Sequence, residues 1–159
     1  MKPEGIVVHC TGGRPDATAE EIDRVHVNER GFAMIGYHFL LRQDGDGWIV
    51  EAGRPVWMEG AHCQAGGRNF SHIGVAIAGD YEMNELPDLA FELLIEVLVE
   101  LCVRLGLSPD SISYHRKEQE QAGASNLKAC PGRFVIDCWD ELINEVSVRL
   151  PLSDVFFLN

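Results

Sequence analysis

Short runs of β-branched and other apolar residues along the chain predict the strands of a buried sheet. The runs GYHFLLRQ and GWIVEAG lie on either side of Asp-Gly-Asp-Gly, which is typical of a β-hairpin. The predicted strands are residues 5–10, 36–43, 47–53, 72–81 and 111–115.

Apolar residues at a helical period predict three helices. The first covers residues 18–31, where Thr18 and Glu21 have the spacing of a capping box and Gly31 follows the last turn. The second covers residues 87–106, and its polar residues recur at every fourth position as one narrow stripe. The rest of its surface is apolar, so we expect other parts of the fold to cover most of its circumference. The third covers about residues 132–149, and a polar loop from 116 to 128 is expected before it.

The order of these elements predicts an α/β fold, a single domain with a central mixed β-sheet flanked by α-helices. We find no repeat, linker or low-complexity stretch, so one domain is expected over residues 1–159, with its core at about 5–150. The tail, residues 151–159, ends in the apolar stretch Phe156, Phe157 and Leu158. We expect it to fold back onto the core, with a dimer contact as the alternative and a monomer as the expected state.

Composition narrows the function classes. A net charge of −12 argues against nucleic-acid binding, because no basic stripe is present to displace counterions from phosphates. No run approaches 18 uncharged apolar residues, so membrane insertion is not expected. The N-terminal residues lack the long apolar region of a signal peptide, which predicts synthesis in the cytoplasm. Five cysteines without a Cys-x-x-Cys pair indicate reduced thiols.

Two histidines stand at predicted strand ends, where ligand sites in α/β sheets tend to lie. His9 closes the first strand and His115 closes the last, and Cys130 follows in a predicted loop. Two imidazoles, one thiolate and an open fourth position are typical of catalytic zinc. The spacing alone is weak evidence, since only the fold can bring these residues together. A cysteine hydrolase that pairs Cys10 or Cys63 with His115 is an alternative, although Cys10 and His9 point to opposite faces of their strand.

Several motifs resemble those of the type 2 N-acetylmuramoyl-L-alanine amidases, a family that includes peptidoglycan recognition proteins and small phage endolysins. The matching segments are VVHCTG, GYHFLLRQDGDGWIVEAGR, HIGVAIAG, YHRKE and KACPG, from about residue 6 to residue 140. The resemblance implies one zinc ion per chain, held by His9, His115 and Cys130. It also implies Tyr37 and Lys128 as catalytic residues, with Lys128 stabilising the oxyanion and Tyr37 holding the water or the tetrahedral intermediate.

One departure from the family decides between its mechanisms. The cell-wall recycling branch has a catalytic glutamate where this chain has Ala76, and an aspartate ligand where this chain has Cys130. The resemblance therefore implies the mechanism that uses tyrosine and lysine. His72 stands where a serine is usual, which leaves its role open, and His26 is expected to be structural.

The function implied by the resemblance is zinc-dependent hydrolysis of the amide bond between N-acetylmuramic acid and L-alanine in bacterial peptidoglycan. The alternative is a non-catalytic peptidoglycan-binding recognition module. His62 corresponds to a histidine that lines the substrate groove in the phage branch, and Asn69 and Arg54 are candidates for contacts with the stem peptide. Peptidoglycan or a muropeptide is the expected partner, reached after release from the cytoplasm as in a phage endolysin.

Overall fold

The computed structural model describes residues 1–150 of the chain. The expected docking of the tail, residues 151–159, lies outside the described residues. Among the described residues, no helix combines the length and the apolar character needed to cross a membrane.

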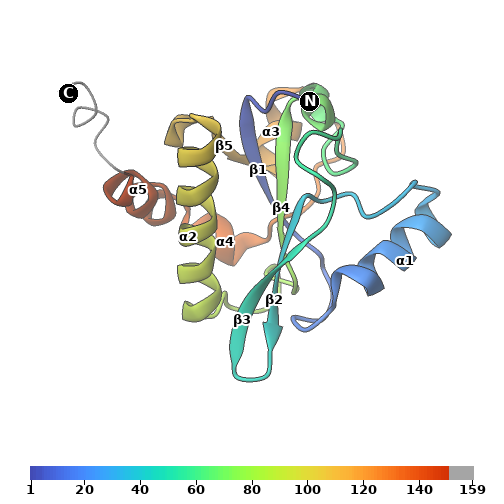
Figure 1. Cartoon of the computed structure of the whole chain (residues 1–159), viewed down its shortest axis with the longest axis horizontal. Coiled ribbons are helices and arrows are strands. Elements are labelled where there is room, and N and C mark those ends of the chain that lie inside the picture. The colour runs from blue at the N-terminus through green and yellow to red at the C-terminus, as the bar shows by residue number, and fades with distance from the viewer. Residues whose placement is uncertain (151–159) are drawn as a thin grey trace.

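A five-stranded mixed sheet forms the centre of the fold, in the order β3-β2-β4-β1-β5 (Figure 1). β1 pairs in parallel with both β4 and β5, β2 pairs in parallel with β4, and only the β2–β3 hairpin is antiparallel. The prediction of a central mixed sheet is therefore confirmed. The strands are β1 (Gly5–Cys10), β2 (Phe39–Asp44), β3 (Gly47–Ala52), β4 (His72–Ile77) and β5 (Ile112–Tyr114).

Helices cover both faces of the sheet, with α2 and α5 on one side and α1 on the other (Figure 1). The larger core cluster joins β1 and β4 to α2 and α5, whereas the smaller one joins Ile22 of α1 to Leu40 and Ala76 of the sheet. The helices are α1 (Ala19–Arg30), α2 (Asp88–Leu105), α3 (His115–Gln121), α4 (Arg133–Asp137) and α5 (Trp139–Arg149), with short 3-10 turns η1 (Ala65–Phe70) and η2 (Pro109–Ser111).

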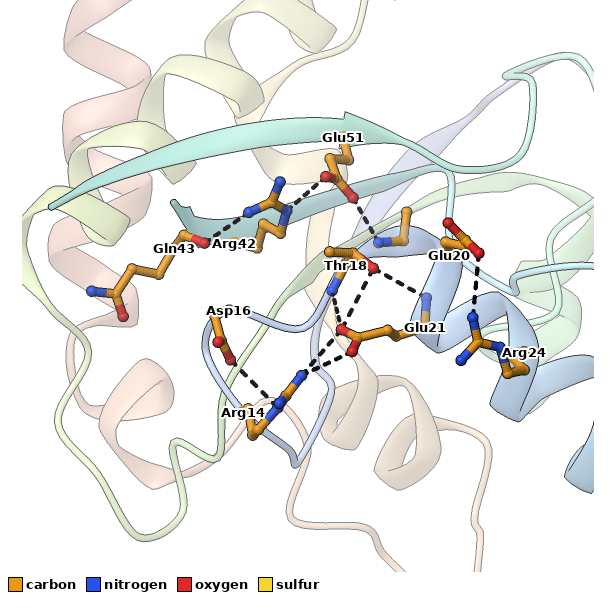
Figure 2. A network of polar contacts seen from close by, with 10 residues as sticks. Arg14, Asp16, Thr18, Glu20, Glu21, Arg24, Arg42, Gln43 and Glu51 are labelled. Atoms are coloured by element: carbon orange, nitrogen blue, oxygen red, sulfur yellow. Dashed lines mark hydrogen bonds and ion pairs between the residues drawn. The ribbon is translucent and has the colours of Figure 1, made fainter. Parts of the chain in front are cut away.

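The start of α1 is tied both to itself and to the hairpin. Thr18 and Glu21 form the predicted capping box, in which each side chain accepts a hydrogen bond from the other's backbone N–H. The carboxylate of Glu51 on β3 accepts from the backbone N–H of Ala19 at 2.6 Å and from Arg42 on β2 at 2.6 Å. Figure 2 shows this network, which fixes the position of α1 against the sheet.

Two helical boundaries differ from the sequence prediction. The segment predicted as a loop after residue 115 begins as α3, a helix whose buried residues are His115 and Glu118. Because both are polar, no apolar period marks this helix in the sequence. The predicted last helix is split into α4 and α5 at Cys138, whose φ of −96° and ψ of 11° depart from helical values.

Candidate metal centre and catalytic groove

The three predicted metal ligands meet at one edge of the sheet. His9 lies near the end of β1, His115 follows β5 as the first residue of α3, and Cys130 lies in the loop before α4. Because β1 and β5 are parallel neighbours, their carboxyl ends lie at the same edge. The possible ligand atoms of these three residues all lie within 4.8 Å of one another. The sheet topology thus supplies the proximity that the sequence spacing could not show.

The donor set and its spacing fit a tetrahedral zinc ion. Sγ of Cys130 lies 3.6 Å from Nδ1 of His9. Zn–S and Zn–N bonds of about 2.3 and 2.1 Å at a tetrahedral angle require roughly 3.6 Å between these two atoms. Burial, followed by the nearby His62, keeps the pKa of His9 well below its ordinary value, and burial with Lys128 lowers the pKa of His115 to about 4. Both imidazoles are therefore neutral near pH 7, as metal ligation requires.

Cys10 is closer to this centre than strand alternation suggests. Its side chain packs against the larger core cluster, on the face of β1 opposite His9, as expected. Cys130, however, lies beyond the strand end, where its Sγ accepts a hydrogen bond from the backbone N–H of Cys10 at 3.3 Å. The hydrogen bond between the two thiols and burial both raise the pKa of Cys130. Cys130 therefore contacts both the ring of His9 and the backbone of Cys10, although the side chains of these two residues lie on opposite faces of β1.

The two predicted catalytic residues line the same cavity as two of the three candidate ligands. This cavity measures about 230 Å³, and its wall includes Tyr37, Lys128, His115 and Cys130. The Tyr37 ring lies 5.3 Å from that of His9, and burial raises the pKa of its hydroxyl, which keeps the O–H protonated. The backbone N–H of Lys128 donates to the side-chain oxygen of Gln119 at 2.8 Å, which attaches this loop to α3.

Two further cavities extend the central one into a groove. One, of about 270 Å³, runs along α1 and shares His26, Arg30 and Tyr37 with the central cavity. The other, of about 370 Å³, lies towards η1 and shares Arg30, His62 and Lys128, among others. The candidate ligands His115 and Cys130 therefore line part of a groove that is made of three adjoining cavities.

Comparison with known proteins places this geometry in a family. A family model described as N-acetylmuramoyl-L-alanine amidase matches residues 1–133. The chain belongs to the N-acetylmuramoyl-L-alanine amidase family. LysC, an amidase from Clostridium intestinale URNW, shares the fold with a TM-score of 0.75 at 24% identity, over 95% of this chain and 88% of LysC.

Curated relatives of this amidase-family chain include phage endolysins and peptidoglycan-recognition proteins. The endolysin of Klebsiella phage KP32 is 35% identical over 106 residues, which are 62% of this chain and 66% of the endolysin. The endolysin of Escherichia phage T7 is 38% identical over 78 residues, or 48% of each chain. Peptidoglycan-recognition protein SC2 of Drosophila melanogaster is 29% identical over 143 residues, which are 86% of this chain and 70% of that protein. The chain thus spans about half to two thirds of the length of these two endolysins.

The predicted substrate-binding residues of the amidase-family chain lie in different surroundings. Arg54 lines none of the three cavities, and its guanidinium donates to the backbone carbonyls of Ile35, Glu59 and Met34 at 2.6, 2.6 and 3.2 Å. This arginine therefore connects the segment before β2 to the loop that contains Glu59.

Asn69 of η1 holds the segment that contains His62. Asn69 lines the η1 side of the groove, where its side-chain oxygen accepts from the backbone N–H groups of His62 and Cys63, both at 2.8 Å. His62 lines the groove and is 8% exposed. Burial, followed by the neighbouring His38, lowers the pKa of His62 to about 3, which keeps its ring neutral.

Two residues near the candidate site, Arg30 and Arg68, were not predicted from the sequence. Arg30, in the last turn of α1, lines all three cavities and brings a cation to the groove of an otherwise acidic protein. In the sequence, the position of Arg30 before Gly31 marks only the end of a helix and does not indicate that its side chain lines the groove. Arg68 of η1 pairs with the buried carboxylate of Glu118 on α3, and only the tertiary fold brings these segments together.

Proposed function

We propose that the chain is a zinc-dependent N-acetylmuramoyl-L-alanine amidase that cleaves the amide bond between N-acetylmuramic acid and L-alanine in bacterial peptidoglycan. The observation that carries this proposal is the convergence of His9, His115 and Cys130, of which His115 and Cys130 line the same cavity as Tyr37 and Lys128. The family membership and the endolysin relatives support the same substrate.

His9, His115 and Cys130 would hold one zinc ion through two imidazole nitrogens and a sulfur. When bound, zinc makes water acidic enough to supply hydroxide near neutral pH and polarises the scissile carbonyl. The backbone N–H of Cys10 donates to the sulfur of Cys130 and so favours its thiolate form, against the opposite effect of the Cys10 side chain and of burial on the pKa of Cys130.

Lys128 and Tyr37 provide the polar groups for the reacting amide. The Lys128 ammonium can stabilise the negative charge that develops on the carbonyl oxygen as water attacks. The Tyr37 hydroxyl, kept protonated by burial, can hold the attacking water or donate to the tetrahedral oxygen. Ala76 lies beside His9 in the β1–β4 register, so no carboxylate from that position of the sheet can act as the base.

The proposed setting is that of a phage endolysin, with synthesis in the cytoplasm and action on the cell wall after release. The KP32 and T7 endolysin relatives support this setting. A monomer remains a prediction that size-exclusion chromatography would test.

A non-catalytic recognition module is the second candidate, and the similarity to peptidoglycan-recognition protein SC2 over 86% of the chain favours it. Mass spectrometry of muropeptides incubated with the zinc-loaded protein separates the two. The amidase releases a free stem peptide that begins with L-alanine and leaves the disaccharide intact. Binding without release would support the recognition module instead.

Matched cysteine variants test the metal centre within the same assay. Cys130→Ser should lose both the bound zinc and the release of stem peptide, whereas Cys138→Ser, at the α4–α5 junction, should retain both. Loss of turnover in Cys10→Ala or Cys63→Ala, in a protein that contains no zinc by metal analysis, would favour the thiol-hydrolase mechanism.

A further inference from the structure

We infer that His62 is a positioning residue that sets the tautomer of His9 and thereby directs the Nδ1 lone pair of His9 at the metal centre. This inference rests on the proposed function, because it gives His62 a role in building the zinc site. It also replaces the substrate contact that the sequence suggested for this residue.

The assignment of protons starts at a backbone carbonyl. Nε2 of His62 lies 3.1 Å from the carbonyl oxygen of His72. A carbonyl oxygen only accepts hydrogen bonds, so Nε2 of His62 must carry the hydrogen. A neutral imidazole has one N–H, which leaves Nδ1 of His62 with a lone pair as an acceptor.

The same logic then fixes the proton on His9. Nε2 of His9 lies 3.0 Å from Nδ1 of His62, in a buried hydrogen bond. Since Nδ1 of His62 accepts, Nε2 of His9 must donate, and the lone pair of His9 is on Nδ1. That atom is the one 3.6 Å from Sγ of Cys130. One carbonyl therefore determines, through two rings, which nitrogen of His9 is free to bind a metal.

The ring of His62 is held in place by close packing. A Cβ atom built on Gly60 would lie 2.3 Å from Cδ2 of His62, and one built on Gly74 would lie 2.6 Å from Cδ2 and Cγ. The side-chain oxygen of Asn69 accepts a hydrogen bond from the backbone N–H of His62, which fixes the backbone there. The imidazole therefore fits between two glycines that leave no room for a side chain.

These contacts leave His62 little to offer a substrate, since both ring nitrogens are already engaged and only 8% of the residue is exposed. A histidine ligand that donates its second N–H to a neighbouring acceptor is held in one orientation and is a more basic ligand. Loss of such a partner typically costs about 10- to 100-fold in metal affinity or activity.

Two substitutions separate the hydrogen bond from the packing. His62→Phe keeps an aromatic ring between the two glycines but removes the acceptor, whereas the side-chain oxygen of His62→Asn can take the place of Nδ1. We expect zinc affinity, measured by competition with a chelator, to fall about 10- to 100-fold in His62→Phe and to recover largely in His62→Asn. Cys138→Ser, at the α4–α5 junction and outside this hydrogen-bonded chain, should bind zinc as the unmodified protein does.

Spectroscopy tests the inference without reference to turnover. Long-range proton–nitrogen NMR correlation on the metal-free protein should show His9 with its hydrogen on Nε2, and a mixture of tautomers for His9 in His62→Phe. The visible spectrum of the cobalt-substituted protein should change in His62→Phe and be close to the original in His62→Asn.

Two results would overturn this role of His62. One is a hydrogen on Nδ1 of His9 in the unmodified, metal-free protein. The other is an unchanged zinc affinity in His62→Phe with a raised KM, which would restore the substrate contact. A protein that binds zinc and shows the expected tautomer but releases no stem peptide would refute the proposed function and leave the role of His62 in place.

Discussion

Arg68 and Glu118 form an ion pair that joins η1 to α3. In the chain, η1 follows His62, and α3 begins with His115. The carboxylate of Glu118 is 4% exposed, whereas the side chain of Arg68 is 30% exposed. This pair connects two walls of the groove on its η1 side. Both elements also carry residues that line this part of the groove.

Removal of the charge of Glu118 should destabilise the fold. In Glu118→Gln the guanidinium of Arg68 loses its partner, and because Arg68 remains partly hydrated, we expect a loss of about 2–3 kcal/mol in the free energy of unfolding. Urea denaturation of the metal-free protein measures this loss. The double variant Arg68→Met/Glu118→Gln should recover part of it, and equal stabilities of Glu118→Gln and the unmodified chain would contradict a structural role for the pair.

Lys128→Ala should retain zinc and lose most of the turnover. The ammonium contributes only where negative charge develops, so we expect kcat for stem-peptide release to fall roughly 10²- to 10³-fold with little change in zinc content. Lys117→Ala, on α3 but outside the lining of the three cavities, is the matched control. Similar losses in both variants would mean that general charge, and not the position of Lys128, supports the reaction.

Tyr37→Phe isolates the hydroxyl from the ring. The ring belongs to the smaller core cluster and lies against those of His9 and His26, so the variant should fold and bind zinc. We expect kcat to fall roughly 10²-fold, the lower end of what a positioned proton donor contributes. Steady-state kinetics on a purified muropeptide would show this, and an unchanged kcat would remove Tyr37 from the mechanism.

Acid should destabilise the protein through buried His26. Its Nδ1 accepts from the backbone N–H of Gly36 at 2.9 Å, and burial lowers its pKa from 6.5 to about 4. Between these two values the unfolded chain binds more protons than the folded one, so stability falls as pH drops from 6.5 towards 4. The contribution of His26 is on the order of 3 kcal/mol over this window.

His26→Asn keeps an acceptor for Gly36 and does not titrate in this range. Urea denaturation at pH 7 and pH 5 should therefore show a smaller loss of stability for His26→Asn than for the unmodified chain. The metal-free protein is the right sample, since zinc would add a pH dependence of its own. An equal loss in both chains would exclude His26 as the source.

Local patterns in the sequence were sufficient for much of the fold. Runs of β-branched and other apolar residues marked the five strands, and Thr18 with Glu21 marked the start of α1, because strand and cap signals depend on neighbouring residues. α3 was missed because its buried side chains are the polar His115 and Glu118, which give no apolar period.

The candidate site was predictable in its residue types but not in its connections. His9, His115 and Cys130 are recognisable as ligand types, and the fold brings them together. The contact of Cys10 with Cys130 depends on where a distant loop crosses the strand end. The two hydrogen bonds of His62 depend on three segments meeting, and no spacing in the sequence encodes them.

The candidate ligands His9 and Cys130 are 121 positions apart along the chain. An ion held between them would close nearly the whole domain into a loop, much as a disulfide does, and the corresponding loss of entropy in the unfolded chain is roughly 4–5 kcal/mol. The metal centre would then serve as a clip between the first strand and the last loop. Removal of the ion by a chelator would therefore lower the stability of the fold as well as abolish the reaction.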